Sequence, residues 1–408
     1  MEVNVARQPI FNRKKQLVGY ELLFRDNPFQ SDTNLLPVDG DSKTSTLLAN
    51  TFFSIGIERL LGEKLGFINF TRNLLLDKFP LLLPKETIVV EILEDIEPDS
   101  SLVDACRDLA EKGYTLALDD FVYNPEIAPL IELAKIIKFD FLLSSNEEIT
   151  HCLQYLPENN KPTLLAEKIE TYEEFNTAQS MGFALFQGYL FCRPEVIKGT
   201  AIPEASFKLL EVIAEVNRDD FDIDKLDSLI APDISITYKL LRYINSAYYS
   251  LNNPISSVQQ ALAYLGQKEI RRFISMIALS NLAEEKPSEL ARSACFRGKF
   301  CESLASISPE NVSEQEAFTL GLLSLIDAFI EQPMEVILEA LPLEDRIKSA
   351  LTNDNCELGS LLKLVEYYEK GQWSEVTTLS EQIGIEEKKL PELYLHACLW
   401  SNSMTNVS

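Results

Sequence analysis

The chain has 408 residues, more than one ordinary hydrophobic core accommodates, which predicts two domains. Hydrophobic residues make up 46% of the sequence and charged residues 25%, as is typical of a water-soluble globular protein. The formal net charge of −26 repels phosphate backbones and anionic lipid, so we expect neither a nucleic-acid partner nor a membrane partner.

The cysteines and the N-terminus predict a cytoplasmic location. Seven cysteines are scattered without a Cys-x-x-Cys pair, a spacing typical of reduced thiols in a cytosolic protein. The first residues lead into a polar run over 12–16, which is not the pattern of a signal peptide. No uninterrupted apolar run approaches the length of a membrane-spanning helix.

The first half of the chain alternates short strand-like runs with amphipathic stretches. The predicted strands are 17–24, 65–70, 87–93, 115–121, 136–139, 163–169 and 185–190, and the predicted helices are 42–61, 99–112, 125–134, 147–156 and 171–181. Such alternation indicates βαβ units with a mostly parallel sheet, and this number of repeats favours a closed, TIM-like (β/α) barrel. We place this α/β barrel at residues 1–198.

The strand pattern stops beyond about residue 199, where apolar residues recur at helical spacing. The predicted helices are 204–216, 224–230, 235–244, 257–265, 268–282, 314–329, 333–340, 359–370 and 390–400. Pro194, Gly199 and Pro203 give the junction the composition of a linker. We therefore predict an all-α domain over residues 199–408.

Polar residues stand inside otherwise apolar strands of the first half. They are Glu21, Asn69, Glu91, Asp119, Asp120, Lys138, Glu167 and Gln187. Any one of them alone is best explained as a solvated strand end. Seven strands that each offer such a group instead indicate a shared site, because the carboxyl ends of barrel strands converge on one face.

A ring of carboxylates with an amide and a lysine suits hard divalent cations, because Mg²⁺ and Mn²⁺ prefer oxygen ligands. Two such ions close together could hold a phosphodiester and activate water for attack on it. The pattern therefore predicts metal-assisted hydrolysis of a phosphoester.

The order of these motifs resembles that of EAL domains, whose signature is Glu-x-Leu-x-Arg. Gln8-Pro9-Ile10 and Glu21-Leu22-Leu23-Phe24-Arg25 look like the opening of that family, and the later motifs follow in the family's order: Ile68-Asn69, Glu91-Ile92, Asp119-Asp120-Phe121, Lys138-Phe139-Asp140, Ala166-Glu167 and Gln187-Gly188-Tyr189. The resemblance covers essentially the whole first half. It implies hydrolysis of cyclic di-GMP to the linear dinucleotide pGpG with two Mg²⁺ or Mn²⁺ ions.

The resemblance also implies roles for individual residues. The expected metal ligands are Glu21, Asn69, Glu91, Asp119 and Asp120. Asp119 would bridge the two ions, and Glu167 would help to hold the second ion. The expected catalytic residues are Lys138, Glu167 and Gln187, with Lys138 orienting the attacking water. Gln8 and Arg25 are the expected substrate-binding residues, since a guanidinium fork is a natural partner of phosphate.

The loop after the two aspartates departs from the EAL pattern. Active family members usually continue with Gly-Thr-Gly, whereas this chain continues with Val122-Tyr123-Asn124-Pro125. The change removes glycines that tolerate positive φ and adds a stiff proline, so we expect a different path. Leu22 and Leu93 also replace a smaller or polar residue. A loop that closes on the metals would favour an enzyme, while a loop packed elsewhere, or Tyr123 filling the site, would favour an adaptor.

Residues 229–282 resemble HDOD domains. The matching stretches are Ile230-Ala231-Pro232, Arg242-Tyr243-Ile244-Asn245-Ser246-Ala247, Leu265-Gly266 and Glu269-Ile270-Arg271-Arg272. The resemblance implies the helical architecture of HD metal phosphohydrolases, generally without their metal-binding His-Asp pair. His151 and His396 are the only histidines of the chain, and neither precedes an aspartate. We expect this half to bind a protein partner or to regulate the barrel.

Two interpretations from different classes therefore stay open. One is a cyclic di-GMP phosphodiesterase with a regulatory or docking HDOD half. The other is a catalytically inactive adaptor, or a cyclic di-GMP receptor, that acts through protein binding, and the chain could form a homodimer in either case. A carbohydrate-processing barrel would explain paired carboxylates but not Lys138, Arg25 and the ordered motifs.

Overall fold

The computed structural model describes residues 4–25, 60–94, 96–157, 159, 161–188, 258–282, 288–309, 312–341, 343–352 and 356–405, with isolated positions between 212 and 255. The predicted helices 42–61, 204–216, 224–230 and 235–244 lie wholly or largely outside these residues. The chain divides into two compact units, Met1–Phe191 with Tyr368–Trp373 and Cys192–Tyr367 with Ser374–Ser408.

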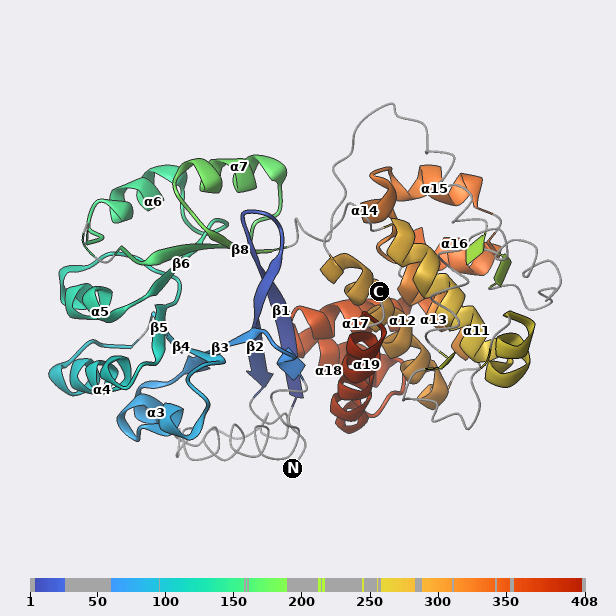
Figure 1. The fold of residues 1–408 in the computed structure, drawn as a ribbon, viewed down its shortest axis with the longest axis horizontal. Helices are drawn as coiled ribbons and strands as arrows, with labels where there is room; N and C mark the ends of the chain where they lie inside the picture. Colours follow the sequence, from blue (N-terminus) through green and yellow to red (C-terminus); the bar gives the residue numbers. More distant parts are fainter. Residues whose placement is uncertain are drawn as a thin grey trace. The chain divides into compact units, whose positions relative to one another are not determined.

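The first unit is a closed barrel of eight strands (Figure 1). The strands are β1 Asn4–Asn12, β2 Leu17–Arg25, β3 Leu65–Phe70, β4 Ile88–Ile92, β5 Thr115–Leu118, β6 Ile136–Asp140, β7 Thr163–Glu167 and β8 Leu185–Gln187. Strands β2 to β8 pair in parallel with their neighbours, and β1 closes the barrel by pairing antiparallel with both β2 and β8. The predicted (β/α) barrel is confirmed, and β1 is a strand that the prediction did not contain.

Helices follow the strands along the outside of the barrel (Figure 1). They are α3 Arg72–Leu76, α4 Ser100–Glu111, α5 Ala128–Leu133, α6 Asn146–Leu153 and α7 Tyr172–Ser180, with the 3₁₀ turns η2 Phe79–Leu82 and η3 Pro125–Ile127. Helices α6 and α7 each begin with a capping box, in which Ser145 pairs with Glu148 and Thr171 pairs with Glu174. Local sequence therefore fixes where these helices begin.

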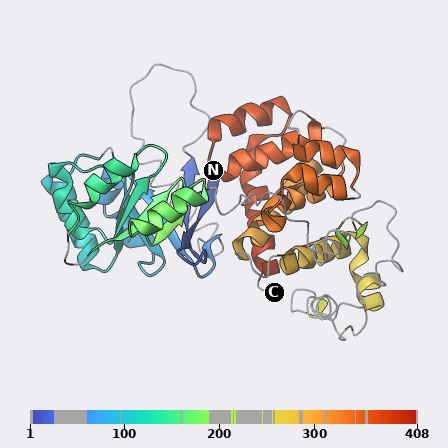
Figure 2. The same ribbon diagram turned by 90° about the horizontal axis from the view of Figure 1, so that it is seen from above.

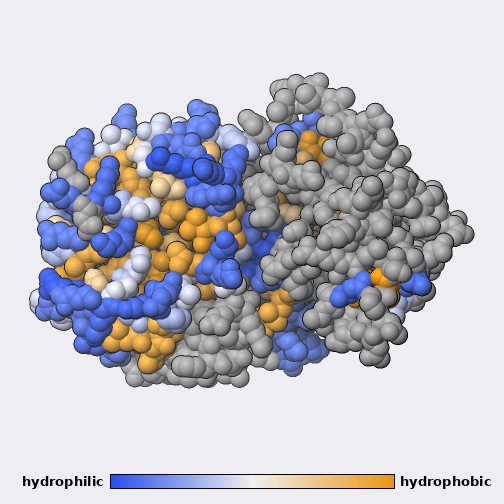
Figure 3. Space-filling model, in the orientation of Figure 1, coloured by the Kyte–Doolittle hydropathy of each residue, from blue (hydrophilic) through white to orange (hydrophobic). Residues whose placement is uncertain are grey.

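Hydrophobic side chains fill the middle of the barrel. Ile10, Phe67, Val89, Ala117, Ile136 and Leu165 form one buried cluster. Each comes from a different strand, so the cluster is a layer across the barrel interior. On the face of this unit seen in Figure 3, hydrophilic residues cover the outer rim and hydrophobic residues gather toward the centre.

The second unit is helical throughout its described residues (Figure 2). Its helices are α11 Val258–Leu282, α12 Ser288–Ile307, α13 Glu314–Leu323, α14 Ile326–Ile330, α15 Met334–Ala340, α16 Asp345–Thr352, α17 Glu357–Glu369, α18 Trp373–Gln382 and α19 Leu390–Thr405, with the turn η5 Glu387–Lys389. Gly266 interrupts α11 with a non-helical φ of 74°, at the break between two predicted helices. The all-α prediction is confirmed for the described residues, and α12, α16 and α18 are additions to it.

Helices α12 and α13 cross at a glycine, and this contact yields a stability prediction. A Cβ on Gly321 would lie 2.4 Å from the carbonyl oxygen of Arg297. In a solvent-exposed helix, replacing glycine with alanine raises the free energy of unfolding by about 1 kcal/mol. At Gly321 the overlap of the added Cβ with backbone atoms outweighs this gain. We expect Gly321→Ala to lower the free energy of unfolding by about 1–3 kcal/mol in urea unfolding followed by circular dichroism.

Gly298→Ala is the graded control for this prediction, because its added Cβ would lie 3.1 Å from the carbonyl oxygen of Phe318. We expect a smaller loss from that change. A Gly321→Ala chain as stable as the wild type would show that the two helices can separate at no cost.

Candidate metal and active site

The candidate site is the layer of side chains directly above the apolar layer of the barrel. Successive residues of a strand alternate between the two faces of the sheet, so a residue two positions further along points the same way. Asn69 thus follows Phe67 into the interior, and Glu91 follows Val89. The same step leads from Ala117 to Asp119, from Ile136 to Lys138, from Leu165 to Glu167 and from Leu185 to Gln187. The expected site residues therefore converge at the carboxyl ends of the strands.

Lys138 lies at the centre of this layer and is fully buried. Its Nζ atom is 2.8 Å from Glu91 Oε1, 2.7 Å from Asp119 Oδ1 and 2.8 Å from Glu167 Oε1. Glu21 Oε1 lies slightly further away, at 3.6 Å. One ammonium group thus contacts four carboxylates that come from four different strands or strand ends.

A chain of hydrogen bonds orients Glu21 within the layer. Gln187 Nε2 donates to Glu21 Oε2 over 2.6 Å and lies 2.9 Å from Gln8 Oε1. Asn69 Nδ2 donates to the other oxygen of Glu21 over 3.2 Å. Gln8 therefore reaches the site from the antiparallel strand β1, and both carboxylate oxygens of Glu21 have an amide donor. Arg25 ends β2, and its side chain lies outside the described part of the chain.

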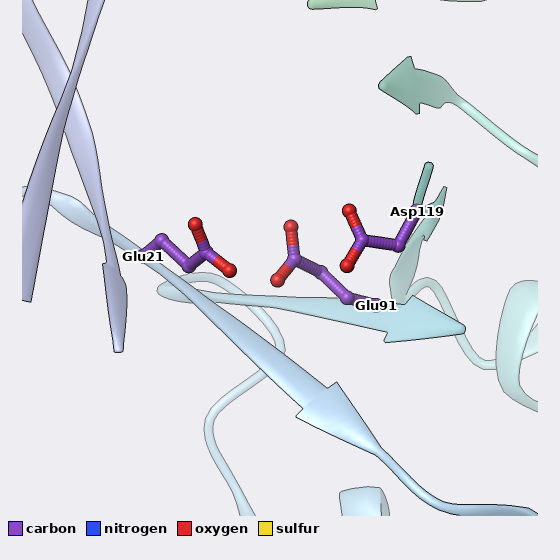
Figure 4. A group of neighbouring side chains, drawn as sticks. All are labelled: Glu21, Glu91 and Asp119. Atoms are coloured by element: carbon purple, nitrogen blue, oxygen red, sulfur yellow. The ribbon is translucent and has the colours of Figure 1, made fainter. Parts of the chain in front are cut away.

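The carboxylates form two groups that could each hold a cation. Oxygen atoms of Glu21, Glu91 and Asp119 all lie within 4.8 Å of one another, and so do those of Asp119, Asp120 and Glu167. Figure 4 shows Glu21 of β2, Glu91 of β4 and Asp119, which follows β5, extending toward one another. Asp119 belongs to both groups, which is the position expected for a bridging ligand.

Unpartnered oxygen atoms indicate that these groups fit a hard cation. Within the described residues, Asn69 Oδ1, Glu91 Oε2, Asp120 Oδ1 and Gln187 Oε1 are buried without a hydrogen-bond partner. Buried oxygen atoms are costly when they lack a partner, and Mg²⁺ or Mn²⁺ binds such oxygens readily. The donor set therefore suits divalent ions of this kind.

The pKa shifts of the layer follow from its burial and its excess of negative charge. Burial raises the pKa of Glu91 well above its ordinary value, against the attraction of Lys138. Burial, together with the charges of Asp119 and Glu21, raises the pKa of Glu167 to about 8. Burial alone would lower the pKa of Lys138, but the surrounding carboxylates outweigh it and raise that pKa well above its ordinary value. Lys138 is therefore charged at neutral pH.

The loop after Asp120 stays attached to the barrel at its start and then packs elsewhere. Asp120 has a φ of 36°, and the amide of Phe121 donates to the Lys138 carbonyl oxygen over 2.9 Å. Tyr123 stacks on Tyr155, which follows helix α6, with ring centroids 3.7 Å apart. Val122 is exposed. Tyr123 therefore does not fill the site.

Two residues at the mouth of the barrel were not among the expected site residues. Asp140 ends β6, and Lys168 follows β7; their side chains form an ion pair. The Lys138-Phe139-Asp140 motif gave a signal for Asp140, whereas Lys168 had none. Elsewhere, His151 lies edge-on to Tyr155, and His396 is part of α19. In the described helical unit no acidic, cysteine or histidine side chains gather into a metal-binding group.

Comparison with known families agrees with this two-domain architecture. Residues 2–194 match the EAL domain family, and residues 202–363 match the HDOD domain family. The chain belongs to the family of proteins that join these two domains. Among the described helices, none combines the length and apolar character that a membrane span requires.

Two relatives match along nearly the whole chain. The chain is 36% identical over 406 residues to a Vibrio cholerae serotype O1 protein named cyclic di-GMP phosphodiesterase CdgJ, a match that covers 99% of this chain and 93% of that protein. It is also 36% identical over 415 aligned positions to the uncharacterized protein YuxH of Bacillus subtilis, covering 99% of both. The solved structure of the Bacillus subtilis EAL-domain protein YkuI, with cyclic di-GMP and calcium, is 21% identical with a TM-score of 0.38 and covers 66% of this chain and 72% of that chain.

Removing the central lysine gives a prediction for stability. We expect Lys138→Met to lower the free energy of unfolding of the metal-free chain by about 3–5 kcal/mol, because it leaves buried carboxylates without their counter-charge. Lys138 lowers the pKa values of Glu91 and Glu167 by its charge, so without it these two pKa values rise further above their unfolded values. An acid whose pKa is raised in the folded state makes the folded chain less stable as pH rises. The loss of free energy of unfolding should therefore be larger at pH 8 than at pH 5.5.

Urea unfolding at the two pH values measures this effect, with the exposed Lys161→Met as the matched control. Equal stability of Lys138→Met and Lys161→Met at pH 8 would contradict the central role of Lys138.

Ion binding should depend on pH because a cation displaces protons from the layer. With its pKa at about 8, Glu167 holds a proton through most of the neutral range when no cation is bound. Because its pKa is raised in the folded state, Glu167 contributes to the free energy of unfolding below its unfolded pKa. This contribution is lost as the pH rises through about 8. We expect Mn²⁺ to bind more tightly at pH 8.0 than at pH 6.5 and to release protons on binding.

Calorimetric titration in two buffers of different ionisation enthalpy measures the released protons. Glu167→Gln should reduce the number released. An unchanged affinity and proton count between pH 6.5 and pH 8.0 would show that Glu167 takes no part in ion binding.

Proposed function

We propose that this chain is a cytoplasmic cyclic di-GMP signalling protein whose barrel hydrolyses cyclic di-GMP to linear pGpG. The observation that carries the proposal is the convergence of Glu21, Glu91 and Asp119 with the Lys138 ammonium in one buried layer at the carboxyl ends of the strands. The full-length relative named a cyclic di-GMP phosphodiesterase supports the choice of substrate.

The residues of the layer suit distinct tasks in phosphodiester hydrolysis. Glu21, Asn69, Glu91 and Asp119 would hold one Mg²⁺ or Mn²⁺ ion, and Asp119, Asp120 and Glu167 would hold a second ion. When bound, such ions supply Lewis-acid activation of the phosphodiester and of water.

The lysine and the amides would position the reacting groups. Lys138 remains protonated in its carboxylate ring, so it can donate a hydrogen bond that orients the attacking water. Gln187 keeps Glu21 in place through a hydrogen bond and can support the water or the substrate. Gln8 and Arg25 are the proposed substrate contacts, with the Arg25 guanidinium directed to a phosphate.

The HDOD half is proposed as a regulatory or protein-docking module. We place the two domains at residues 1–198 and 199–408 and assign no chemistry to the second domain. Its described residues lack a metal-binding group, which suits a role in binding a protein partner rather than in catalysis. A homodimer is compatible with this role.

A second candidate function is a non-catalytic receptor or adaptor. The observation that favours it is the loop after Asp120, because Tyr123 packs on Tyr155 and not over the carboxylates. In that case the barrel would bind cyclic di-GMP, or only form a scaffold, and the output would be protein binding. Retention of every expected metal ligand favours the phosphodiesterase.

Hydrolysis of cyclic di-GMP by the full chain with Mn²⁺ tests the proposal. We expect Glu21→Ala to reduce turnover by at least about 100-fold, because it removes an ion ligand that two amides orient. The exposed Glu63→Ala is the matched control and should leave turnover unchanged.

A parallel binding titration with Ca²⁺ in place of Mn²⁺ separates the two candidates. Binding without turnover would establish the receptor, and turnover that survives in Glu21→Ala would contradict the assignment of the site. A chain that neither binds nor hydrolyses cyclic di-GMP would be a scaffold.

A further inference from the structure

Lys168 presents a positive charge at the mouth of the barrel, and the proposed chemistry gives it no role. It directly follows the candidate ligand Glu167, and its φ of 54° lies in the left-handed region that few residues other than glycine adopt. Its side chain is 49% exposed, and its ammonium pairs with Asp140. A disfavoured backbone conformation therefore carries this cation at the rim of the site.

Asp140 fixes where the ammonium of Lys168 lies. This aspartate is buried, and its Oδ1 atom accepts from the amides of Leu142 over 2.7 Å and Leu143 over 2.9 Å. Its other oxygen is the one that pairs with Lys168. Because the turn after β6 holds the carboxylate, the cation is held between the ends of β6 and β7.

The charge of Lys168 acts on one of the two carboxylate groups. Lys168 directly follows Glu167 in the chain, and its partner Asp140 is in register with Glu167 across strands β6 and β7. Glu167 is a member of the Asp119–Asp120–Glu167 group and not of the Glu21–Glu91–Asp119 group. Lys138 contacts members of both groups and so does not distinguish them. Lys168 therefore adds a positive charge on one side only.

We propose that the positive charge of Lys168 lowers the affinity of the Asp119–Asp120–Glu167 group for a divalent ion. The Glu21–Glu91–Asp119 group then binds such an ion more tightly. The inference rests on the proposed function for the presence of two ion positions. A fixed positive charge beside a cation site repels the incoming ion, and the effect is moderate because the ammonium is half exposed. The first ion then binds tightly, while occupancy of the second position follows the free concentration of divalent ions.

Variants of Lys168 test this inference through ion binding alone. Lys168→Met removes the charge and keeps the length of the side chain. Lys168→Gly also removes the charge, and glycine adopts a φ of 54° without strain, so this second variant is expected to fold.

Lys78→Met is the matched control for the charge. Lys78 also has a positive φ, of 58°, pairs with an aspartate, Asp108, over 2.9 Å and is 53% exposed. It belongs to the same unit, in the turn between α3 and η2, and has no contact with the carboxylate layer among its ion pairs.

The measurement is a titration of the metal-free full chain with Mn²⁺ at pH 7.5, followed by the electron paramagnetic resonance signal of free Mn²⁺. We expect two affinity classes in the wild type. Both Lys168 variants should tighten the weaker class by about 10-fold and leave the tighter class within about two-fold, while Lys78→Met changes neither. The difference between wild type and Lys168→Met should shrink in 0.5 M salt, because screening acts on the exposed ammonium.

Three results would overturn the inference. Equal affinity of the two positions in the wild type, or a weaker class that Lys168→Met and Lys168→Gly leave unchanged or loosen, would contradict the role of Lys168 alone. A wild-type chain that binds no Mn²⁺ would contradict the metal centre of the proposed function as well. Because the readout is ion binding, a lack of hydrolysis leaves the test of Lys168 intact.

Discussion

The buried ammonium of Lys138 is the interaction on which the mouth of the barrel depends. Its ammonium contacts Glu91, Asp119 and Glu167. These carboxylates are shielded from water, and without the lysine they would repel one another. Burial of such charges is tolerated only when they are paired, and one lysine cannot neutralise four acids. Burial first, and the excess negative charge second, raise the pKa values of Glu91 and Glu167. Divalent cations would relieve this excess, so the layer is suited to bind them.

The barrel places this layer by strand alternation and by its antiparallel first strand. Strands β3 to β8 each supply an apolar side chain to the lower layer and a polar one two residues later, which sets the height of the site. Strand β1 runs the other way and brings Gln8 up to Gln187, whose amide also orients Glu21. The site thus combines a rigid floor with hydrogen-bonded ligands, while the loop from Val122 and the Lys168–Asp140 pair shape its rim.

Much of this arrangement could be predicted from the sequence, because polar residues in apolar strands are conspicuous. The strand over 65–70 and the layer residues from Glu21 to Gln187 follow from local pattern and family resemblance. Strand β1 was not predicted, because Pro9 and its polar neighbours obscure the alternation of apolar and polar residues. Helix α12 was not predicted, because buried charged residues such as Arg297 and Glu302 interrupt the spacing of its apolar residues. Contacts between distant residues, such as Tyr123 on Tyr155, require the fold itself, and the left-handed backbone of Lys168 is one that sequence patterns assign to glycine.

The most direct test of the account is a crystal structure of the chain grown with Mn²⁺ and examined by anomalous scattering at the manganese edge. The account predicts manganese peaks within the carboxylate layer, one among Glu21, Glu91 and Asp119 and, at high ion concentration, one among Asp119, Asp120 and Glu167. A layer that contains no manganese at millimolar Mn²⁺, with Lys138 still in contact with its carboxylates, would contradict the central claim. The ring would then be a self-contained structural ion cluster.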